Sequence, residues 1–256
     1  MLIIIGLGLE KGDLSVRALE AAAASDRLYI EQYTAFISAE YISFLKRETG
    51  KEIVELGRPD LEENSGILIS AAKQENIAIL VPGDPLIATT HHATLLDTAK
   101  KQDVECRIFH ASSIYSAAVG ESGLDVYKFG PAVTIAYWSD KYKPTSFLDR
   151  IESNIKNNSH TLVLLDLNQK EKKPMSLAEA MELLRSAGMG KEGSVIRNDL
   201  RVLIMGNVGK EDQKTAYVTL GETARVSDVF DGKMLVLIIP AEMSFAEQES
   251  ISRHSR

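Results

Sequence analysis

The stretch Met1-Leu-Ile-Ile-Ile-Gly6-Leu-Gly8-Leu-Glu-Lys-Gly12-Asp13 decides the fold class. Four consecutive apolar residues, three of them β-branched, predict a buried strand over residues 2–7. The glycines that follow predict a turn in which the backbone passes close to another segment or to a ligand. Asp13 is the expected N-cap of an alanine-rich helix over residues 14–24. A buried strand followed by a glycine turn and a helix is typical of an α/β unit.

The same alternation of strands and helices continues through the first half of the chain. Strands are expected at residues 2–7, 27–31, 51–55, 77–81 and 104–109, and helices at residues 14–24, 61–73 and 92–101. This pattern is typical of a parallel sheet that is covered by helices on both faces. We therefore predict an N-terminal α/β domain over residues 1–112.

The second half predicts another α/β domain, over residues 113–256, with a different rhythm. Strands are expected at residues 132–137, 161–167, 202–205, 215–219 and 234–239. The later strands are separated by segments of turn length, which favours a mixed sheet. Ser176 and Glu179 form a capping box that predicts a helix over residues 177–185, ending near Gly188. The glycines between residues 111 and 131 mark the boundary.

Composition narrows the class of protein further. The chain has 256 residues, of which 45% are hydrophobic and 25% charged, so it is not disordered, collagen-like or a coiled coil. Its net charge of -7 argues against nucleic acid as a partner. Glu10 directly follows the first apolar run, which argues against a signal peptide. No apolar run approaches the ~20 residues of a membrane span, so we expect a soluble, cytoplasmic protein. Cys106 is the single cysteine and is expected as a buried free thiol.

The glycines at positions 6, 8 and 12 invite comparison with the dinucleotide-binding fingerprint. Glu31 ends the second expected strand. Its spacing in the sequence from the glycines is about that of the carboxylate that binds the ribose in the fingerprint. However, the third glycine of the fingerprint would stand at position 11, which is Lys11, and Glu10 and Asp13 would repel a pyrophosphate. Binding of a nicotinamide or flavin cofactor and a plain turn without a ligand both remain alternatives.

The fourth expected strand is followed by Pro82-Gly-Asp84-Pro-Leu-Ile-Ala-Thr-Thr-His91, at the end where open α/β sheets bind ligands. Two prolines and a glycine make this turn rigid and hold the Asp84 carboxylate at the edge of the sheet. A binding role for Asp84 is favoured, and the alternative is that it caps the next helix.

The fifth expected strand is followed by His110-Ala-Ser112-Ser113-Ile-Tyr-Ser, at the start of a helix. Hydroxyls and free backbone N–H groups at such a position can bind a carboxylate, and a simple N-cap is the alternative. No nucleophile elbow surrounds Ser112 or Ser113. The five histidines have no metal-ligand spacing, so no metal is expected, and His92 is expected on a helix surface.

These segments, in this order, resemble the tetrapyrrole methylase-type, or class III, S-adenosylmethionine-dependent methyltransferases. The similarity extends over nearly the whole chain and includes Glu31-Gln-Tyr-Thr34, Val126-Tyr-Lys-Phe-Gly130 and residues 161–166. The resemblance implies two α/β domains of the tetrapyrrole methylase type, with a cleft for S-adenosylmethionine between them, and a homodimer. The closest resemblance is to the branch that methylates an aminocarboxypropyl-modified histidine of elongation factor 2, which would be the protein substrate.

The resemblance also places the cofactor contacts of the family on particular positions. Carried over by position, they are Leu9, Asp84, Ile87, Ser113, Ile114, Leu165, Val208 and Leu235. Most are apolar, because such contacts would be made by backbone amides and by packing around an adenine and a ribose.

No catalytic residue is assigned from the sequence. A sulfonium methyl group is already activated, so its in-line displacement chiefly requires alignment with the acceptor amine. Glu31, Tyr33 and Thr34 lie near the expected opening of the cleft, but none is identified as a base. A corrinoid or other tetrapyrrole methyltransferase, an NAD-dependent dehydrogenase and a non-catalytic nucleotide-binding regulator remain alternatives.

Overall fold

Buried apolar strands form a five-stranded parallel sheet in the first of the two units into which the chain divides, Met1–Ile114 and Tyr115–Arg256. The computed structural model describes residues 1–89, 91–189 and 191–254. The strands of this sheet are β1 (Leu2–Gly6), β2 (Arg27–Glu31), β3 (Ile53–Leu56), β4 (Ile77–Val81) and β5 (Cys106–Phe109). They pair in the order β3-β2-β4-β1-β5, and every pair is parallel, as predicted.

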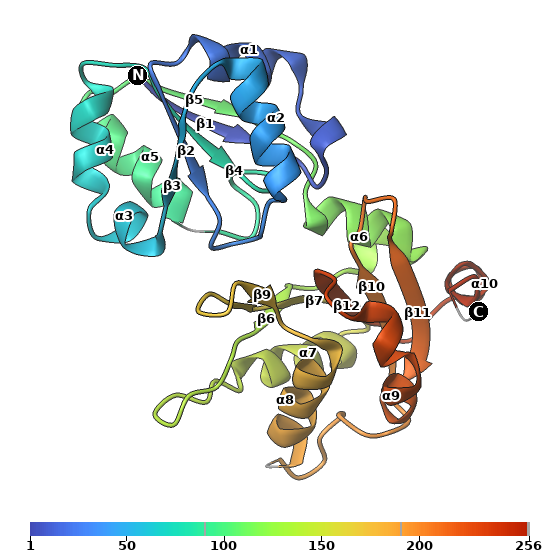
Figure 1. Cartoon of the computed structure of the whole chain (residues 1–256). Helices are drawn as coiled ribbons and strands as arrows, with labels where there is room; N and C mark the ends of the chain where they lie inside the picture. Colours follow the sequence, from blue (N-terminus) through green and yellow to red (C-terminus); the bar gives the residue numbers. More distant parts are fainter. Residues whose placement is uncertain (90, 190, 255–256) are drawn as a thin grey trace. The chain divides into compact units, whose positions relative to one another are not determined.

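Helices cover both faces of this sheet (Figure 1). On β1, Ile3 and Ile5 lie on the face of the sheet that is covered by α1 (Val16–Ala24) and α2 (Ala39–Thr49). Leu2 and Ile4 lie on the other face, which is covered by α3 (Arg58–Glu62), α4 (Ser65–Ala72) and α5 (His91–Lys101). Both faces of the strand are therefore apolar, which is why the sequence shows a continuous apolar run rather than an alternation.

The second unit contains a mixed five-stranded sheet, also as predicted. Its strands are β6 (Val133–Ile135), β7 (Thr161–Leu165), β10 (Arg201–Gly206), β11 (Lys214–Thr219) and β12 (Leu235–Ile239). They pair in the order β11-β10-β12-β7-β6, and only the β6–β7 pair is parallel. Strands β8 (Leu167–Asn168) and β9 (Lys173–Pro174) form a separate ribbon.

The core of the second unit lies between one face of the mixed sheet and α7 (Ser146–Lys156) and α8 (Leu177–Met189). The remaining helices are α6 (Ile114–Ser122), α9 (Thr223–Val226) and α10 (Phe245–Ser252), with short 3-10 turns at Lys11–Asp13, Val126–Lys128, Leu220–Glu222 and Ser227–Phe230. The capping box of α8 is confirmed, because Ser176 N donates to Glu179 Oε2 at 2.8 Å and Glu179 N donates to Ser176 Oγ at 3.3 Å.

Several local predictions are wrong. Asp13 does not cap α1, because Ser15 is the N-cap and its hydroxyl accepts from Ala18 N. The single helix expected over residues 61–73 is two helices, α3 and α4. Cys106 is half-buried rather than buried, and partial burial raises the pKa of its thiol.

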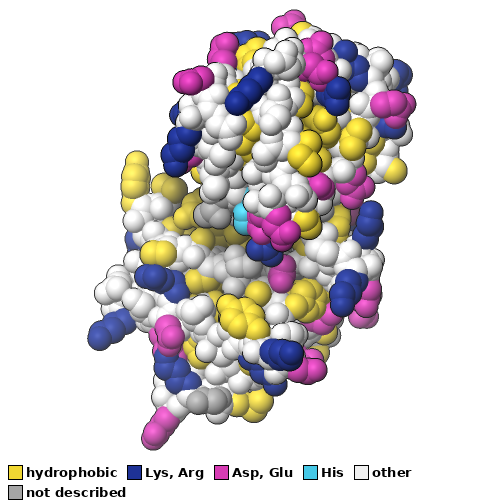
Figure 2. Space-filling view, turned by 90° about the vertical axis from the view of Figure 1, so that its left-hand side faces the viewer, with side chains coloured by type: hydrophobic (Ala, Val, Ile, Leu, Met, Phe, Trp, Pro, Cys, Tyr) yellow, Lys and Arg dark blue, Asp and Glu magenta, His cyan; other side chains and the backbone are white. Residues whose placement is uncertain are grey.

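Figure 2 shows one face of the molecule, which carries side chains of both charges. On the face shown in Figure 2, basic and acidic side chains are interspersed over each unit, with hydrophobic side chains scattered between them. Within the part of the chain that the structure describes, no helix has both the length and the apolar character needed to cross a membrane.

Candidate active site

Three of the predicted segments meet at the carboxyl ends of β4, β1 and β5, which are neighbours in the sheet. Gly8 N donates to Gly83 O at 3.2 Å, and Gly83 N donates to Gly8 O at 2.9 Å. A Cβ atom at Gly6 would lie 2.7 Å from Gly83 O and 2.9 Å from Ala111 Cβ. Glycine is therefore required at the end of β1, because the turn after β4 and the segment after β5 both approach its backbone.

The carboxylate of Asp13 joins the first of these segments to the third. Its Oδ2 atom accepts from Leu9 N at 2.8 Å, from Glu10 N at 3.3 Å and from Ser112 Oγ at 2.5 Å. These bonds fix the loop after β1 against the loop after β5. Asp13, expected at the start of α1, thus has a structural role in the site itself.

Asp84 is buried and holds the second segment against the third. Its Oδ1 atom accepts from Leu86 N at 2.9 Å, and its Oδ2 atom lies 2.8 Å from His110 Nδ1 and accepts from Ala111 N at 3.2 Å. None of these partners belongs to α5, so the described residues show no cap of that helix by Asp84. The carboxylate instead fixes the backbone of two neighbouring loops.

The charges at this edge of the sheet suit a cationic ligand. Asp13 and Asp84 both lie there, and Lys11 is the only lysine or arginine in residues 6–13, 82–89 and 110–114. Lys11 Nζ lies 3.3 Å from Glu40 Oε1, so its charge is compensated. A pyrophosphate would be repelled here, whereas the positive sulfonium of S-adenosylmethionine would be attracted. The residues present therefore fit S-adenosylmethionine better than NAD.

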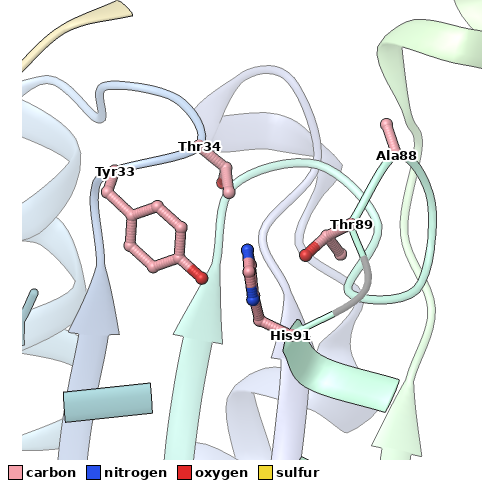
Figure 3. Close-up of a pocket in the computed structure, with 5 residues that line it drawn as sticks. All are labelled: Tyr33, Thr34, Ala88, Thr89 and His91. Atoms are coloured by element: carbon pink, nitrogen blue, oxygen red, sulfur yellow. The ribbon is translucent and has the colours of Figure 1, made fainter. Parts of the chain in front are cut away.

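A pocket of about 430 Å³ opens beside the turn that carries Asp84. Its lining residues are Tyr33, Thr34, Ala88, Thr89 and His91. Figure 3 shows the His91 ring standing between the phenol of Tyr33 and the side chain of Thr89. Ala88 has a φ of 59°, in the left-handed region that alanine rarely adopts, so the turn is held in a strained conformation next to the pocket.

Glu31 and His92 are buried next to this pocket. The carboxylate of Glu31 accepts from Tyr33 N at 2.5 Å, Thr34 N at 2.6 Å and Thr34 Oγ1 at 2.7 Å, which shapes the turn after β2. Burial raises the pKa of Glu31, although the hydrogen bonds from Thr34 and Tyr33 oppose this. The sequence placed Glu31 near the expected opening of the cleft without a role, and the structure shows it as the buried support of a turn.

His92 is not on a helix surface, as was expected, but is fully buried. Its Nδ1 atom lies 2.8 Å from Pro85 O and therefore donates to that carbonyl. Its Nε2 atom lies 3.9 Å from Glu31 Oε2 and has no hydrogen-bond partner among the described residues. Burial lowers the pKa of His92, which keeps the imidazole neutral. His92 thus supports the Pro85 turn from beneath.

The predicted contact residues of the first unit lie around this edge. Leu9 and Ile114 are half-buried, Ser113 is buried, and Ile87 is 44% exposed. Ile87 follows Asp84 by three residues, and Ile87 N lies 3.4 Å from Asp84 O. An exposed isoleucine on a turn fixed by two prolines is available for an apolar contact with a ligand.

The predicted contact residues of the second unit lie at one end of three neighbouring strands of the mixed sheet, β10, β12 and β7. Leu164 pairs with Val236 and Gly206 pairs with Leu235, which places Leu165, Leu235 and the segment containing Val208 together. The side chains of Val208 and Leu235 are buried. Any ligand contact there would therefore come chiefly from the backbone.

The residues that the structure describes contain no group of three or more His, Cys, Asp or Glu that could hold a metal ion.

The family of Tetrapyrrole (Corrin/Porphyrin) Methylases matches residues 1–224. The chain therefore belongs to this family, which confirms the resemblance noted in the sequence and makes it an S-adenosylmethionine-dependent methyltransferase.

Within the family, the chain is similar to proteins named diphthine synthase. It is 36% identical over 250 residues to the diphthine synthase of Methanothermobacter thermautotrophicus, covering 97% of this chain and 93% of that one. It is 33% identical over 254 residues to that of Methanocaldococcus jannaschii, covering 98% and 97%. A crystal structure of diphthine synthase matches with a TM-score of 0.87 at 32% identity, covering 99% of this chain and 95% of that one. Nothing in these similarities supports the dehydrogenase alternative.

Proposed function

We propose that this chain acts as a diphthine synthase. It would transfer methyl groups from S-adenosylmethionine to the amine of an aminocarboxypropyl group on a modified histidine of elongation factor 2. The observation that carries the proposal is the joining of residues 6–13, 82–89 and 110–113 into one acidic, glycine-lined edge by the contacts of Asp13 and Asp84. The similarity to enzymes of that name over nearly the full length of both chains supports the choice of substrate.

The cofactor contacts in this proposal come from both units. They are Leu9, Asp84, Ile87, Ser113 and Ile114 in the first unit and Leu165, Val208 and Leu235 in the second. When bound, S-adenosylmethionine supplies an activated methyl group. The residues of the chain then have to orient the acceptor amine and hold it in line at near-attack distance. A rigid turn such as residues 82–89 is suited to this task, because it limits motion of the groups that touch the ligand.

A labelled-methyl assay tests the proposal directly. Purified protein with methyl-labelled S-adenosylmethionine is offered elongation factor 2 carrying the aminocarboxypropyl group, or a free corrinoid. The proposal expects label in elongation factor 2. Strong labelling of the corrinoid with none in the protein substrate would assign the chain to a tetrapyrrole methyltransferase instead. Calorimetry with S-adenosylhomocysteine and with NAD provides an independent test of the cofactor.

We also propose that the protein is a homodimer and acts in the cytoplasm. Both follow from the family resemblance and from an elongation factor as substrate. Light scattering on the purified protein tests the first, with a mass near twice 28.1 kDa as the expected result. A mass of a single chain at assay concentrations would contradict it.

A further inference from the structure

We propose that His91 is the base that removes the proton from the acceptor amine and that Glu62 positions it. The proposal rests on the proposed function for the identity of the amine, and on the pocket for the identity of the base. The α-amino group of a peptide has a pKa of about 8 in water, and an amine beside a free carboxylate is more basic, so the acceptor amine is mostly protonated and non-nucleophilic at neutral pH. Some group must therefore accept a proton before each methyl transfer.

The pocket lies where such a group is needed. Ala88 and Thr89, which line it, belong to the same turn as Asp84 and Ile87, the proposed cofactor contacts. The hydroxyl oxygen of Thr89 is buried and has no hydrogen-bond partner among the described residues. A buried hydroxyl without a partner is costly in a folded protein and points to a polar ligand. The aminocarboxypropyl group offers both a carboxylate and an amine that could satisfy it.

The geometry of His91 suits a base. Its Nδ1 atom lies 2.9 Å from Glu62 Oε1, and a carboxylate can only accept, so this nitrogen carries the proton. In the neutral imidazole the lone pair then belongs to Nε2, which has no partner among the described residues. The Glu62 carboxylate therefore holds the imidazole in this tautomer and orientation.

The other groups that face His91 are unsuited to this role. Burial and the charges of Glu31 and Glu62 raise the pKa of Tyr33, whose ring packs edge-on against His91 with centroids 5.8 Å apart. Glu31 is fully buried and accepts three hydrogen bonds, and His92 donates to Pro85 O from beneath the turn. Arg58 Nε lies 2.6 Å from the same Glu62 oxygen, so it helps to hold this carboxylate in place.

The ammonium of the substrate gives one proton to His91 Nε2 and becomes a neutral amine. Its lone pair forms a bond to the methyl carbon, the carbon–sulfur bond breaks, and its electron pair stays on the sulfur of S-adenosylhomocysteine. The imidazolium then loses its proton to water, which is possible because the His91 side chain is 28% exposed. One proton leaves for each methyl group transferred.

The test compares His91→Asn with the wild-type protein, using aminocarboxypropylated elongation factor 2. We expect calorimetry to give a dissociation constant for S-adenosylhomocysteine within about threefold of wild type. We expect kcat to fall by about 10²- to 10⁴-fold near neutral pH, which is typical for loss of a general base. This deficit should shrink as the pH rises above about 9, because a growing share of the amine then loses its proton unaided. Imidazole added to His91→Ala should restore part of the rate.

Glu62→Gln should lower kcat less than His91→Asn. The matched control is Glu52→Gln, because Glu52 also pairs with a cation, Lys46, but lies outside the site. Nitrogen NMR of labelled histidine in the protein without ligand gives a readout besides activity. It should show His91 as the Nδ1–H tautomer, and Glu62→Gln should reduce this population.

The outcomes separate this inference from the proposed function. If wild-type protein labels elongation factor 2 and His91→Asn does so at the same rate, the role of His91 is refuted while the function stands. A deficit of the same size at every pH, together with a lowered melting temperature, would assign His91 a structural role and also refute the proposal. If wild-type protein does not label elongation factor 2, the proposed function is overturned, and this inference is overturned with it.

Discussion

His110 Nδ1 lies 2.8 Å from Asp84 Oδ2, and this contact joins the ends of β4 and β5 on either side of β1. The two residues are 26 positions apart in the sequence, and the side chain of Asp84 is buried whereas that of His110 is exposed. A single carboxylate thus fixes two loops that the sequence alone could only place after separate strands. This arrangement makes the effects of Asp84 substitutions predictable.

Asp84→Ala should weaken both ligand binding and folding. The first effect follows from the proposed cofactor contact, since a charge-assisted hydrogen bond contributes ~1.5 to 3 kcal/mol, or roughly 10- to 150-fold in affinity. The second follows because Leu86 N and Ala111 N would lose their acceptor. Calorimetry and thermal melts with S-adenosylhomocysteine measure both effects.

The conservative variant Asp84→Asn and the control Asp97→Asn sharpen this test. An asparagine keeps an acceptor for Leu86 N but removes the charge, so affinity should fall more than stability. Asp97 is exposed on α5, and its substitution should change neither. An Asp84→Ala protein with a lowered melting temperature but a normal ligand-induced shift would show that Asp84 is purely structural.

Strong chelation should leave methyl transfer unchanged. A sulfonium methyl group is activated without a Lewis acid, and the residues that the structure describes present no cluster of metal-ligating side chains. The assay is labelled methyl transfer to elongation factor 2 after dialysis against EDTA. Loss of activity that returns on addition of zinc would show that a metal takes part.

The prediction of this fold from sequence succeeded where the signal is local. Residues 27–31 and 77–81 were predicted as strands with the bounds of β2 and β4, because each contains a short apolar run of residues that favour strands. The capping box of α8 involves residues three positions apart, so it is visible in the sequence. The burial of β1 on both faces of the sheet was also predictable, because its run of apolar residues places apolar side chains on both faces.

Contacts between distant residues were not predictable in the same way. The strand order decides that Asp84 meets His110 and that Asp13 meets Ser112, and no pattern in the sequence specifies that order. Similarly, the pairing of His91 with Glu62 depends on how α3 packs against α5. His92 was misplaced because neighbouring histidines on a helix point in different directions, and only packing decides which is buried.

The buried carboxylate of Glu247 should make the second unit sensitive to acid. It accepts from His160 Nε2 at 2.7 Å, Ser244 N at 2.8 Å, Asp125 N at 3.0 Å and Lys128 Nζ at 3.0 Å. Burial alone would raise the pKa of Glu247, but these donors outweigh it and hold the pKa well below its usual range. The stabilisation is therefore complete above about pH 4.5 and is lost as the pH falls towards the folded-state pKa.

His160 contributes to stability in the same direction. Its Nδ1 atom accepts from Ala241 N at 3.0 Å, so the ring is the neutral tautomer that donates from Nε2. Burial lowers the pKa of His160 despite the nearby Glu247, so its contribution is present above about pH 6.5 and falls as the pH decreases.

Glu247→Gln should therefore lower the free energy of unfolding by at least about 2 kcal/mol at pH 7, because charge-assisted hydrogen bonds are lost. The difference from wild type should shrink below about pH 4.5, where Glu247 itself becomes protonated in the unfolded chain. Urea unfolding at several pH values measures this. Glu249→Gln, on the exposed side of the same helix, is the control. If the free energies of unfolding of Glu247→Gln and wild type differed by the same amount at every pH, the charge of Glu247 would not have the role proposed here.

Gly8 should tolerate alanine poorly, whereas Gly12 should accept it. Gly8 has a φ of +74°, and a Cβ atom there would lie 2.1 Å from Asp13 Cβ and 2.9 Å from Ser112 Oγ. The left-handed backbone costs an L-residue about 1 to 2 kcal/mol, and displacement of Asp13 would release Ser112 as well. At Gly12 no atom lies within 4 Å of such a Cβ, and its φ is not positive.

Gly8→Ala should lower the melting temperature and the affinity for S-adenosylhomocysteine, and Gly12→Ala should change neither. Thermal melts with and without the ligand measure both properties. If the two variants had the same melting temperature and affinity, the close packing of Gly8 against Asp13 and Ser112 would not be needed to hold the loops of the site together.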